Sequence, residues 1–308
     1  MENVVEVKDL VKKYGNFTAV DGITFNVKKG EIFGLLGENG AGKTTTLEII
    51  EGLRKMTAGK VSVLGEDISY GCHDCVKQKI GVQLQSSAYY NFLTLREILD
   101  LFGSFYEKAL SPEELLSMVD LKDKAKSLVG DLSGGQKQRF SIVASLVNDP
   151  ELVFLDEPTT GLDPVARRNL WDLIAMIKKQ GKTIILTTHY MEEAEILCDR
   201  IAIMDHGKIL AMGETHKLIT ETENPFRMSF ILAKPDKKVD EVIVKLGVLE
   251  HVAEKANHYV GRFATQSKLN EALRVVFEKN PESLTVSKAS LEDLFISLTG
   301  REMEDDNV

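Results

Sequence analysis

The sequence predicts an α/β protein with a mixed, mainly parallel sheet, an inserted helical subdomain and a small α+β domain toward its C-terminal end. Three observations predict this fold class. Residues 4–213 alternate short β-branched runs with longer helical runs, which is typical of a largely parallel sheet. Strand signals fade between residues 85 and 129, where helical periodicity takes over. The polar stretch 221–225 ends in a proline and indicates a domain boundary.

Length, composition and charge limit the classes of function. The 308 residues suffice for about two domains, and 43% hydrophobic with 28% charged residues is ordinary for a globular protein. A net charge of -9 argues against a nucleic-acid partner, because such proteins are usually basic. Residues 1–7 lack a secretory pattern, and no apolar run approaches the roughly 20 residues of a membrane span. We therefore expect a cytoplasmic chain that does not itself cross the membrane.

The first domain, residues 1–220, is expected to contain the main sheet. Its expected strands are 4–10, 23–27, 31–36, 80–84, 152–155, 183–187 and 201–204. The early pair around Asn16 and Asp21-Gly22 is expected to be antiparallel, which makes the sheet mixed.

A glycine-rich loop follows the buried run 32–36 and precedes a helix that stops at Gly52. This strand-loop-helix context fits a P-loop, whose backbone N–H groups surround phosphates, and predicts a P-loop NTPase core. Lys43 would reach the outer phosphates and Thr44 would offer its hydroxyl to Mg²⁺. A turn without a ligand would not need a lysine there. The residues expected to bind the nucleotide in this segment are Gly37, Glu38, Asn39, Gly40, Ala41, Gly42, Lys43, Thr44 and Thr45.

The helical subdomain is expected at about residues 86–140, between two halves of the sheet. Its periodicity places Leu95, Ile98 and Leu99 on one helical face. Ser111 is expected to cap a second helix, with Pro112 in the first turn.

Residues 132–136, Leu-Ser-Gly-Gly-Gln, have two compatible interpretations. Ser133 followed by Gln136 fits a capping box at the start of an ordinary helix. The two glycines also leave backbone N–H groups uncovered at a helix N-terminus, which favours an anion such as a nucleotide phosphate.

The apolar run 152–155 predicts a strand buried on both faces, with Asp156 and Glu157 at its carboxyl end. Ligands bind at that edge of open α/β sheets. Asp156 is therefore expected to hold Mg²⁺, and Glu157 to polarise a water for attack on the terminal phosphate. The alternative is a solvated acidic pair at a strand end.

Two further polar residues follow predicted elements. Asp163, before Pro164, is expected to cap a helix. His189 follows the strand 183–187, where an imidazole could donate a hydrogen bond to a γ-phosphate oxygen, although a lone histidine is more often structural.

Taken together in this order, these motifs make residues 4–213 resemble the ATP-binding cassette (ABC) ATPases. The resemblance implies that Tyr14 stacks on adenine and that Gln85 approaches Mg²⁺ and a membrane partner, with Gln83 as the alternative register. It also implies that Asp163 lies at a dimer interface, where Ser133 and Gly135 reach the γ-phosphate of ATP held by a second subunit. The site residues expected on this basis outside the glycine loop are Tyr14, Ser133, Gly135, Gln136 and Asp163 for ATP, Gln85, Glu157 and His189 with Lys43 for catalysis, and Thr44, Gln85 and Asp156 for Mg²⁺.

The second domain, residues 225–300, is expected to have the order βαββαβ. Its expected strands and helices are 226–232, 237–246, 249–253, 259–264, 268–278 and 283–287, followed by a last helix at 291–298. Residues 301–308 are expected to be a flexible tail. The segment 291–302 resembles the C-terminal segment of drug- and antibiotic-resistance-type exporter ATPases.

Three cysteines suit a reducing compartment. Cys72-His73-Asp74-Cys75 has the spacing of a fragment of a metal site, but no second Cys/His pair follows, so reduced thiols in a loop are the favoured interpretation.

The sequence thus predicts an ATP-hydrolysing subunit that drives transport, with export favoured over import. Its expected partners are a separate transmembrane permease and a second ATPase subunit, either an identical copy or a related chain, on the cytoplasmic face of the membrane. Two other classes stay open: a soluble cassette ATPase that acts on DNA or ribosomes, and a regulatory binding module.

Overall fold

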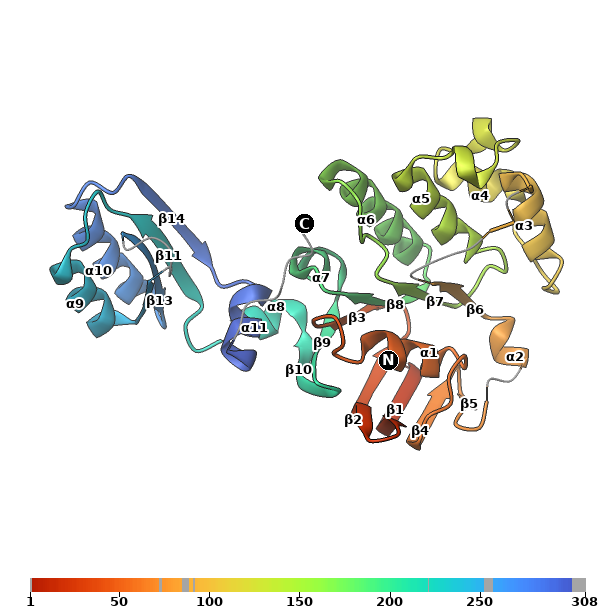
Figure 1. The fold of residues 1–308 in the computed structure, drawn as a ribbon, viewed down its shortest axis with the longest axis horizontal. Coiled ribbons are helices and arrows are strands. Elements are labelled where there is room, and N and C mark those ends of the chain that lie inside the picture. The colour runs from red at the N-terminus through yellow and green to blue at the C-terminus, as the bar shows by residue number, and fades with distance from the viewer. Residues whose placement is uncertain are drawn as a thin grey trace. The chain divides into compact units, whose positions relative to one another are not determined.

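The computed structural model describes residues 2–71, 74–84, 89–90, 92–220, 222–251 and 257–300. They divide into two compact units, with the boundary between Gly213 and Glu214. Figure 1 shows the elements of both units along the chain. Helix α8 (Thr215–Thr220) belongs to the second unit by this division.

The first unit is built on a six-stranded sheet in the order β10-β9-β3-β8-β7-β6. Its strands are β3 (Ile32–Leu36), β6 (Ile80–Gln83), β7 (Leu152–Asp156), β8 (Thr183–Thr188), β9 (Arg200–Asp205) and β10 (Lys208–Glu214). The run from β9 to β6 is parallel throughout, and every residue of β3, β7 and β8 is buried. Because parallel strands end at the same edge, the loops after β3, β7 and β8 meet there.

A second, four-stranded sheet has the order β2-β1-β4-β5. Its strands are β1 (Asn3–Tyr14), β2 (Phe17–Lys28), β4 (Ala58–Val63) and β5 (Glu66–Asp67), and the expected antiparallel pairing of the first two strands is confirmed. The pair stands in this separate sheet and not at an edge of the parallel one. Both sheets share a core with helix α1 (Lys43–Ile50), in which the rings of Phe25 and Phe33 stack with centroids 5.3 Å apart.

Helices fill the segment between β6 and β7, where the sequence predicts the helical subdomain (Figure 1). They are α3 (Leu95–Gly103), α4 (Pro112–Met118), the short 3₁₀ turns at Lys122–Lys124 and Val129–Asp131, and α5 (Gly134–Ala144). Thr94 closes a capping box at α3, and the Ser111 hydroxyl caps α4 as expected. The remaining helices of this unit are α2 (Asp74–Lys77), α6 (Pro164–Lys179) and α7 (Met191–Leu197).

The second unit has the predicted βαββαβ order. Its elements are β11 (Phe226–Ile231), α9 (Lys237–Leu246), β12 (Val248–His251), β13 (His258–Phe263), α10 (Gln266–Phe277), β14 (Ser283–Lys288) and α11 (Leu291–Thr299). The antiparallel sheet order β12-β13-β11-β14 is that of a split βαβ fold. Its core includes the stacked rings of Phe230 and Tyr259, and α11 packs against α8. Residues 301–308 lie outside the described residues.

Candidate nucleotide-binding site

The glycine loop connects β3 to α1 and packs closely on neighbouring backbone. A Cβ added to Gly37 would lie 2.3 Å from the carbonyl oxygen of Met204, and one on Gly42 would lie 2.5 Å from that of Ala19. Gly42 has a φ of 98° and caps α1 without a side-chain hydrogen bond. The first-turn N–H groups of α1 therefore have no side-chain cap and suit an anion.

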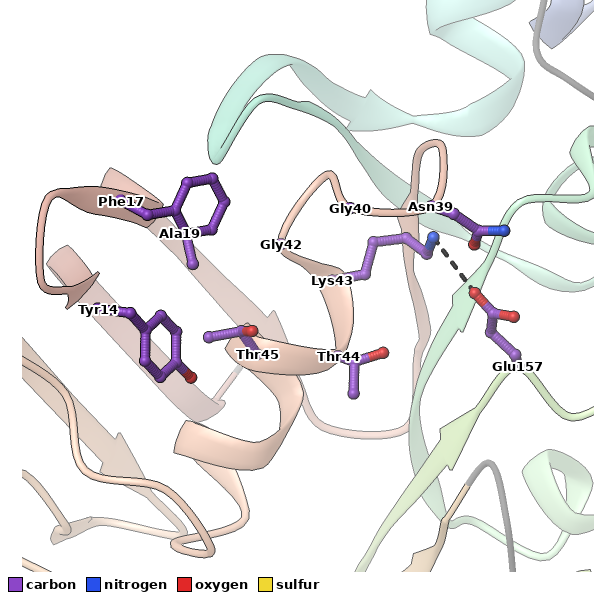
Figure 2. Close-up of a pocket in the computed structure, with 10 residues that line it drawn as sticks. All are labelled: Tyr14, Phe17, Ala19, Asn39, Gly40, Gly42, Lys43, Thr44, Thr45 and Glu157. Carbon is purple, nitrogen blue, oxygen red and sulfur yellow. Dashed lines mark ion pairs between the residues drawn. The ribbon is translucent and has the colours of Figure 1, made fainter.

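The side chain of Lys43 is buried and folds back onto the glycine loop. Its Nζ donates to the carbonyl oxygens of Gly37 at 2.8 Å and Glu38 at 3.1 Å. It also lies 3.3 Å from Oε1 of Glu157, the ion pair that Figure 2 marks with a dashed line. Lys43 thus brings a positive charge to the edge where β7 ends.

Two oxygen ligands face each other beside the lysine. The Thr44 hydroxyl donates to Oδ1 of Asp156 at 3.2 Å, and the hydroxyl of Thr187 donates to the same oxygen at 2.5 Å. Burial raises the pKa of Asp156 more than these hydrogen bonds lower it. A hydroxyl and a buried carboxylate at this spacing fit a hard cation such as Mg²⁺, which prefers oxygen ligands.

Glu157 is fixed by both its backbone and its side chain. It adopts a left-handed φ of 46°, and its N–H donates to Oγ1 of Thr187 at 3.0 Å. Its Oε2 accepts from the Thr160 hydroxyl at 3.2 Å and lies 3.3 Å from Nδ1 of His189. Burial raises the pKa of Glu157, but the neighbouring His189 imidazole and the charge of Lys43 outweigh it and lower the pKa to about 2. Glu157 is consequently an ionised carboxylate at neutral pH.

A cavity of about 430 Å³ opens over the glycine loop. Figure 2 shows that it runs from Glu157 and Lys43, past the first turn of α1, to the aromatic ring of Tyr14. Tyr14 is 41% exposed, and the Lys12 ammonium lies 4.8 Å from its ring centroid. A polar phosphate end and an aromatic end within one cavity match the two halves of a nucleotide. The lining residues are Tyr14, Phe17, Ala19, Asn39, Gly40, Gly42, Lys43, Thr44, Thr45 and Glu157.

Three residues of the site are not predicted from the sequence: Phe17 and Ala19 in this lining, and Thr187, which contacts Asp156. Phe17 pairs with Tyr14 across the tight turn that joins β1 to β2, so its proximity could have been read from the hairpin. Thr187 reads as an ordinary residue of a buried strand, because β-branched residues are common there.

The residues expected to contact ATP from the 132–136 segment, and Asp163, lie outside the lining of this cavity. Ser133 caps α5, where it accepts from the Gln136 N–H at 3.4 Å while the Gln136 side chain accepts from the Ser133 N–H at 3.1 Å. Gly135 packs against α6, since a Cβ there would lie 3.2 Å from that of Ala166. Asp163 caps α6 by accepting two backbone N–H bonds at 2.9 Å. None of these residues lines the cavity over the glycine loop within the described part of the chain.

The predictions for Gln85 and for the segment 72–75 involve residues that the structure does not describe. Gln85 lies outside the described residues, whereas Gln83 is buried at the end of β6 and its Nε2 donates to the Leu84 carbonyl at 2.6 Å. Cys72 and His73 also lie outside the described residues, and Cys75 is exposed in α2. Among the residues described, no group of three or more His, Cys, Asp or Glu side chains suits a metal ion.

The parallel sheet, the glycine loop and the Asp156-Glu157 edge define a P-loop ATPase. Within this class, the ABC transporter family matches residues 20–160. The Nod factor export ATP-binding protein I of Rhizobium sp. (strain N33) is 38% identical and aligns with 97% of this chain and 98% of its own length. The linearmycin resistance ATP-binding protein LnrL of Bacillus subtilis (strain 168) is 37% identical over 98% of this chain and all of its own. The chain therefore belongs to the ABC transporter ATP-binding proteins and is an ABC transporter ATPase.

Solved structures match about 70% of the chain. The ADP conformation of an ATP-binding cassette of an ABC transporter is 26% identical, with a TM-score of 0.63 over 70% of this chain and 92% of that one. A dimeric post-hydrolysis cassette bound to ADP and Pi is 28% identical, with a TM-score of 0.61 over 68% and 98%. The predicted fold class and the predicted ATP-binding function are confirmed. No helix in the described ranges is both long and apolar enough to span a membrane.

Proposed function

We propose that this chain hydrolyses ATP to power export through a separate transmembrane permease. The ionised Glu157 carboxylate, held between Lys43 and His189 where β7 ends, is the observation that carries the proposal. The names of the export and resistance proteins that match the whole chain favour export over import.

In this proposal, each residue at the end of β7 has a task toward the terminal phosphate of ATP. Lys43 supplies charge to the phosphates, and His189 donates a hydrogen bond to a γ-phosphate oxygen. Glu157 orients and polarises the attacking water. A carboxylate with a pKa of about 2 is a weak base. It can therefore orient and polarise the water but is not suited to remove a proton completely before the attack.

Mg²⁺ is held by Thr44 and Asp156 in this proposal. When bound, the ion neutralises charge that develops on the phosphate oxygens. The Thr187 hydroxyl keeps the Asp156 carboxylate in place, because it donates to the oxygen that also accepts from Thr44.

The adenine is assigned to Tyr14, at the aromatic end of the same cavity. Tyr14 is partly exposed, and the cations of Lys12 and Arg54 lie over its ring.

A second subunit completes each site. Ser133 and Gly135 belong to the N-terminus of α5 but do not line the cavity of their own chain, so we assign them to ATP held by a partner copy or a related chain. A dimeric cassette among the similar structures supports this arrangement. Asp163, at the N-terminus of α6, is placed at the same interface in this proposal.

The permease is assigned to a second cavity, of about 490 Å³, which we call the α1–α5 groove. Residues 51–53, which follow α1, line it together with residues of strand β6 and helices α3 and α5. Aromatic and aliphatic side chains dominate the lining, as in sites that bind a partner's apolar residues. Gln85 follows β6 in sequence, so we propose that this segment transmits the state of the nucleotide to the permease. The chain would thus be peripheral on the cytoplasmic face of the membrane.

The variant Glu157→Gln tests the function directly. The amide keeps the shape of the side chain but loses its charge, so the rate of ATP hydrolysis should fall by about 10²–10⁴-fold while ATP still binds. ATP-bound dimers should then accumulate in size-exclusion chromatography. Glu192→Gln, an exposed change on α7, should retain both the rate and the monomer-dimer balance. A binding module without turnover would show no difference between the two variants.

A further inference from the structure

Glu51 is a buried carboxylate that the ATPase reaction does not use. It follows the last residue of α1 and is 4% exposed. Neither Oε1 nor Oε2 has a hydrogen-bond partner among the described residues. Buried polar groups in proteins are nearly always hydrogen-bonded, so an unpartnered pair of oxygens needs an explanation.

The surroundings make this carboxylate costly for the chain on its own. Burial, with the charges of Asp156 and Glu48 adding to it, raises the pKa of Glu51 to about 8. The carbonyl groups at the end of α1 also place negative partial charge beside it. A leucine at this position would avoid these costs, so the carboxylate does not serve the stability of the isolated chain.

Glu51 lines the α1–α5 groove, which is otherwise largely apolar. Among the described lining residues, Glu51 and Lys77 have charged side chains, and Lys77 is 3.0 Å from Oδ1 of Asp74. Arg54, the nearest arginine in sequence, is paired with Glu48. The positive charges closest to Glu51 in sequence or in the groove thus already have acidic partners.

We propose that Glu51 binds the guanidinium of an arginine carried by an amphipathic segment of the permease. The groove offers two unpartnered oxygens, and a guanidinium can donate to both at once, which an ammonium does less well. Apolar neighbours of that arginine pack on the rings of Tyr89, Phe102 and Tyr106. This inference rests on the proposed function, because it names the group on the permease that the groove recognises.

The size of the groove agrees with such an occupant. A volume of about 490 Å³ lies in the range of about 300–1,000 Å³ that is typical of ligand sites and is ample for a few side chains. The permease segment presents an apolar surface with one arginine to the groove, and the groove recognises that arginine by its charge.

Glu51→Gln tests the inference in the assembled transporter. The full chain is combined with candidate transmembrane permeases in detergent or nanodiscs, and the affinity and the ATPase stimulation are measured. Glu51→Gln should weaken association at least tenfold and leave the basal ATPase rate of the isolated chain within about twofold, because loss of one partner of a buried charge pair is costly. Glu48→Gln, one helical turn earlier and outside the groove lining, is the matched control and should bind as the parent does.

A double-mutant cycle identifies the arginine. Each cytoplasmic arginine of the transmembrane protein is changed to glutamine, alone and with Glu51→Gln. One arginine should reproduce the loss, and its effect should not add to that of Glu51→Gln. Fully additive losses at every arginine, or unchanged affinity of Glu51→Gln, would overturn the inference.

A small-molecule probe separates this inference from the proposed function. Hexylguanidinium carries the same cation on an apolar chain, and hexylurea is its uncharged counterpart. NMR signals of the Tyr89 and Tyr106 rings should shift with hexylguanidinium in the parent chain but much less with hexylurea or in Glu51→Gln. Equal shifts with both compounds would refute the role of Glu51. If no transmembrane protein stimulates the parent ATPase but this selectivity holds, the proposed function fails while the cation site stands.

Discussion

Nδ1 of His189 lies 3.3 Å from Oε2 of Glu157, and both side chains are buried. The two residues follow β8 and β7, which are neighbours in the sheet, so the strand order alone brings them together. Glu157 also contacts Lys43 of the glycine loop. Three loops of the parallel sheet thus converge on one carboxylate.

His189→Ala should raise the pKa of Glu157, because the neighbouring imidazole favours the ionised carboxylate. We expect the rate of ATP hydrolysis to fall by about 10²–10⁴-fold and the acidic limb of the pH-rate profile to move to higher pH. The pH dependence of kcat measures both effects. His206→Ala, at an exposed position, is the control, and an unmoved acidic limb in His189→Ala would contradict the pairing.

Thr187→Val should distinguish the role of the Thr187 hydroxyl in holding Asp156 from the role of its side chain in packing the strand. Valine keeps the shape but removes the hydroxyl that donates to Asp156 and accepts from the Glu157 N–H. We expect a loss of about 1–3 kcal/mol in the free energy of unfolding and a higher Mg²⁺ concentration for half-maximal ATPase activity. Thr183→Val loses one hydrogen bond, from the Gly30 N–H, at the opposite end of β8. Equal Mg²⁺ dependence in the two variants would refute the role of Thr187.

Glu51→Gln should change how stability depends on pH. The pKa of Glu51 is raised in the folded state from 4.5 to about 8, so its protonated form stabilises the fold below about pH 4.5 and this contribution is lost as pH rises toward 8. At about 1.36 kcal/mol per pKa unit, the gain of Glu51→Gln over the parent at pH 8 has an upper limit of about 5 kcal/mol. Urea unfolding at pH 5 and pH 8 measures it. A gain that is the same at both pH values would show that Glu51 does not titrate in this window.

Ser133→Arg should abolish ATP hydrolysis while leaving nucleotide binding to the monomer within a few-fold. The arginine obstructs the face assigned to the second subunit, whereas the glycine loop lies elsewhere in the chain. ATPase assays, nucleotide titration and light scattering on dimers measure the three outcomes. Ser111→Arg removes a comparable cap from α4, at a cost of about 1 kcal/mol, and should hydrolyse ATP normally. Loss of nucleotide binding in Ser133→Arg would place this segment in its own chain's site.

The residues at the parallel edge were predictable because their signals are local. The strand 152–155 is an unbroken apolar run, which indicates a buried strand, and ligands of such sheets bind at the carboxyl ends of the strands. Ser133 and Asp163 were recognisable as caps for the same reason, since capping depends on a few neighbouring residues.

Features that depend on distant parts of the chain were not predictable from local patterns. The pairing of β1 with β2 is predictable because a tight turn joins them. The separate sheet to which they belong also needs β4, and the first residues of β4 are exposed and lack a strand signal. Strand β10 was also not predicted, because residues 209–212 are all apolar in sequence although their burial alternates along the strand. Glu51 reads as a solvated acid at a helix end, because nothing near it in sequence reveals the groove that α5 closes over it.

The α1–α5 groove has a thermodynamic consequence for a dimeric transporter. Helix α1 begins at the glycine loop and is followed at the groove by Glu51, while α5 begins after Ser133 and reaches the groove at Ser141 and Ala144. In a dimer in which Ser133 serves the other subunit's ATP, one groove therefore touches helices from both nucleotide sites. Any occupant whose affinity depends on nucleotide must change nucleotide affinity by the same factor in return. The affinity of a single permease segment would then depend on two ATP molecules, and its binding would change the affinity of both sites for ATP.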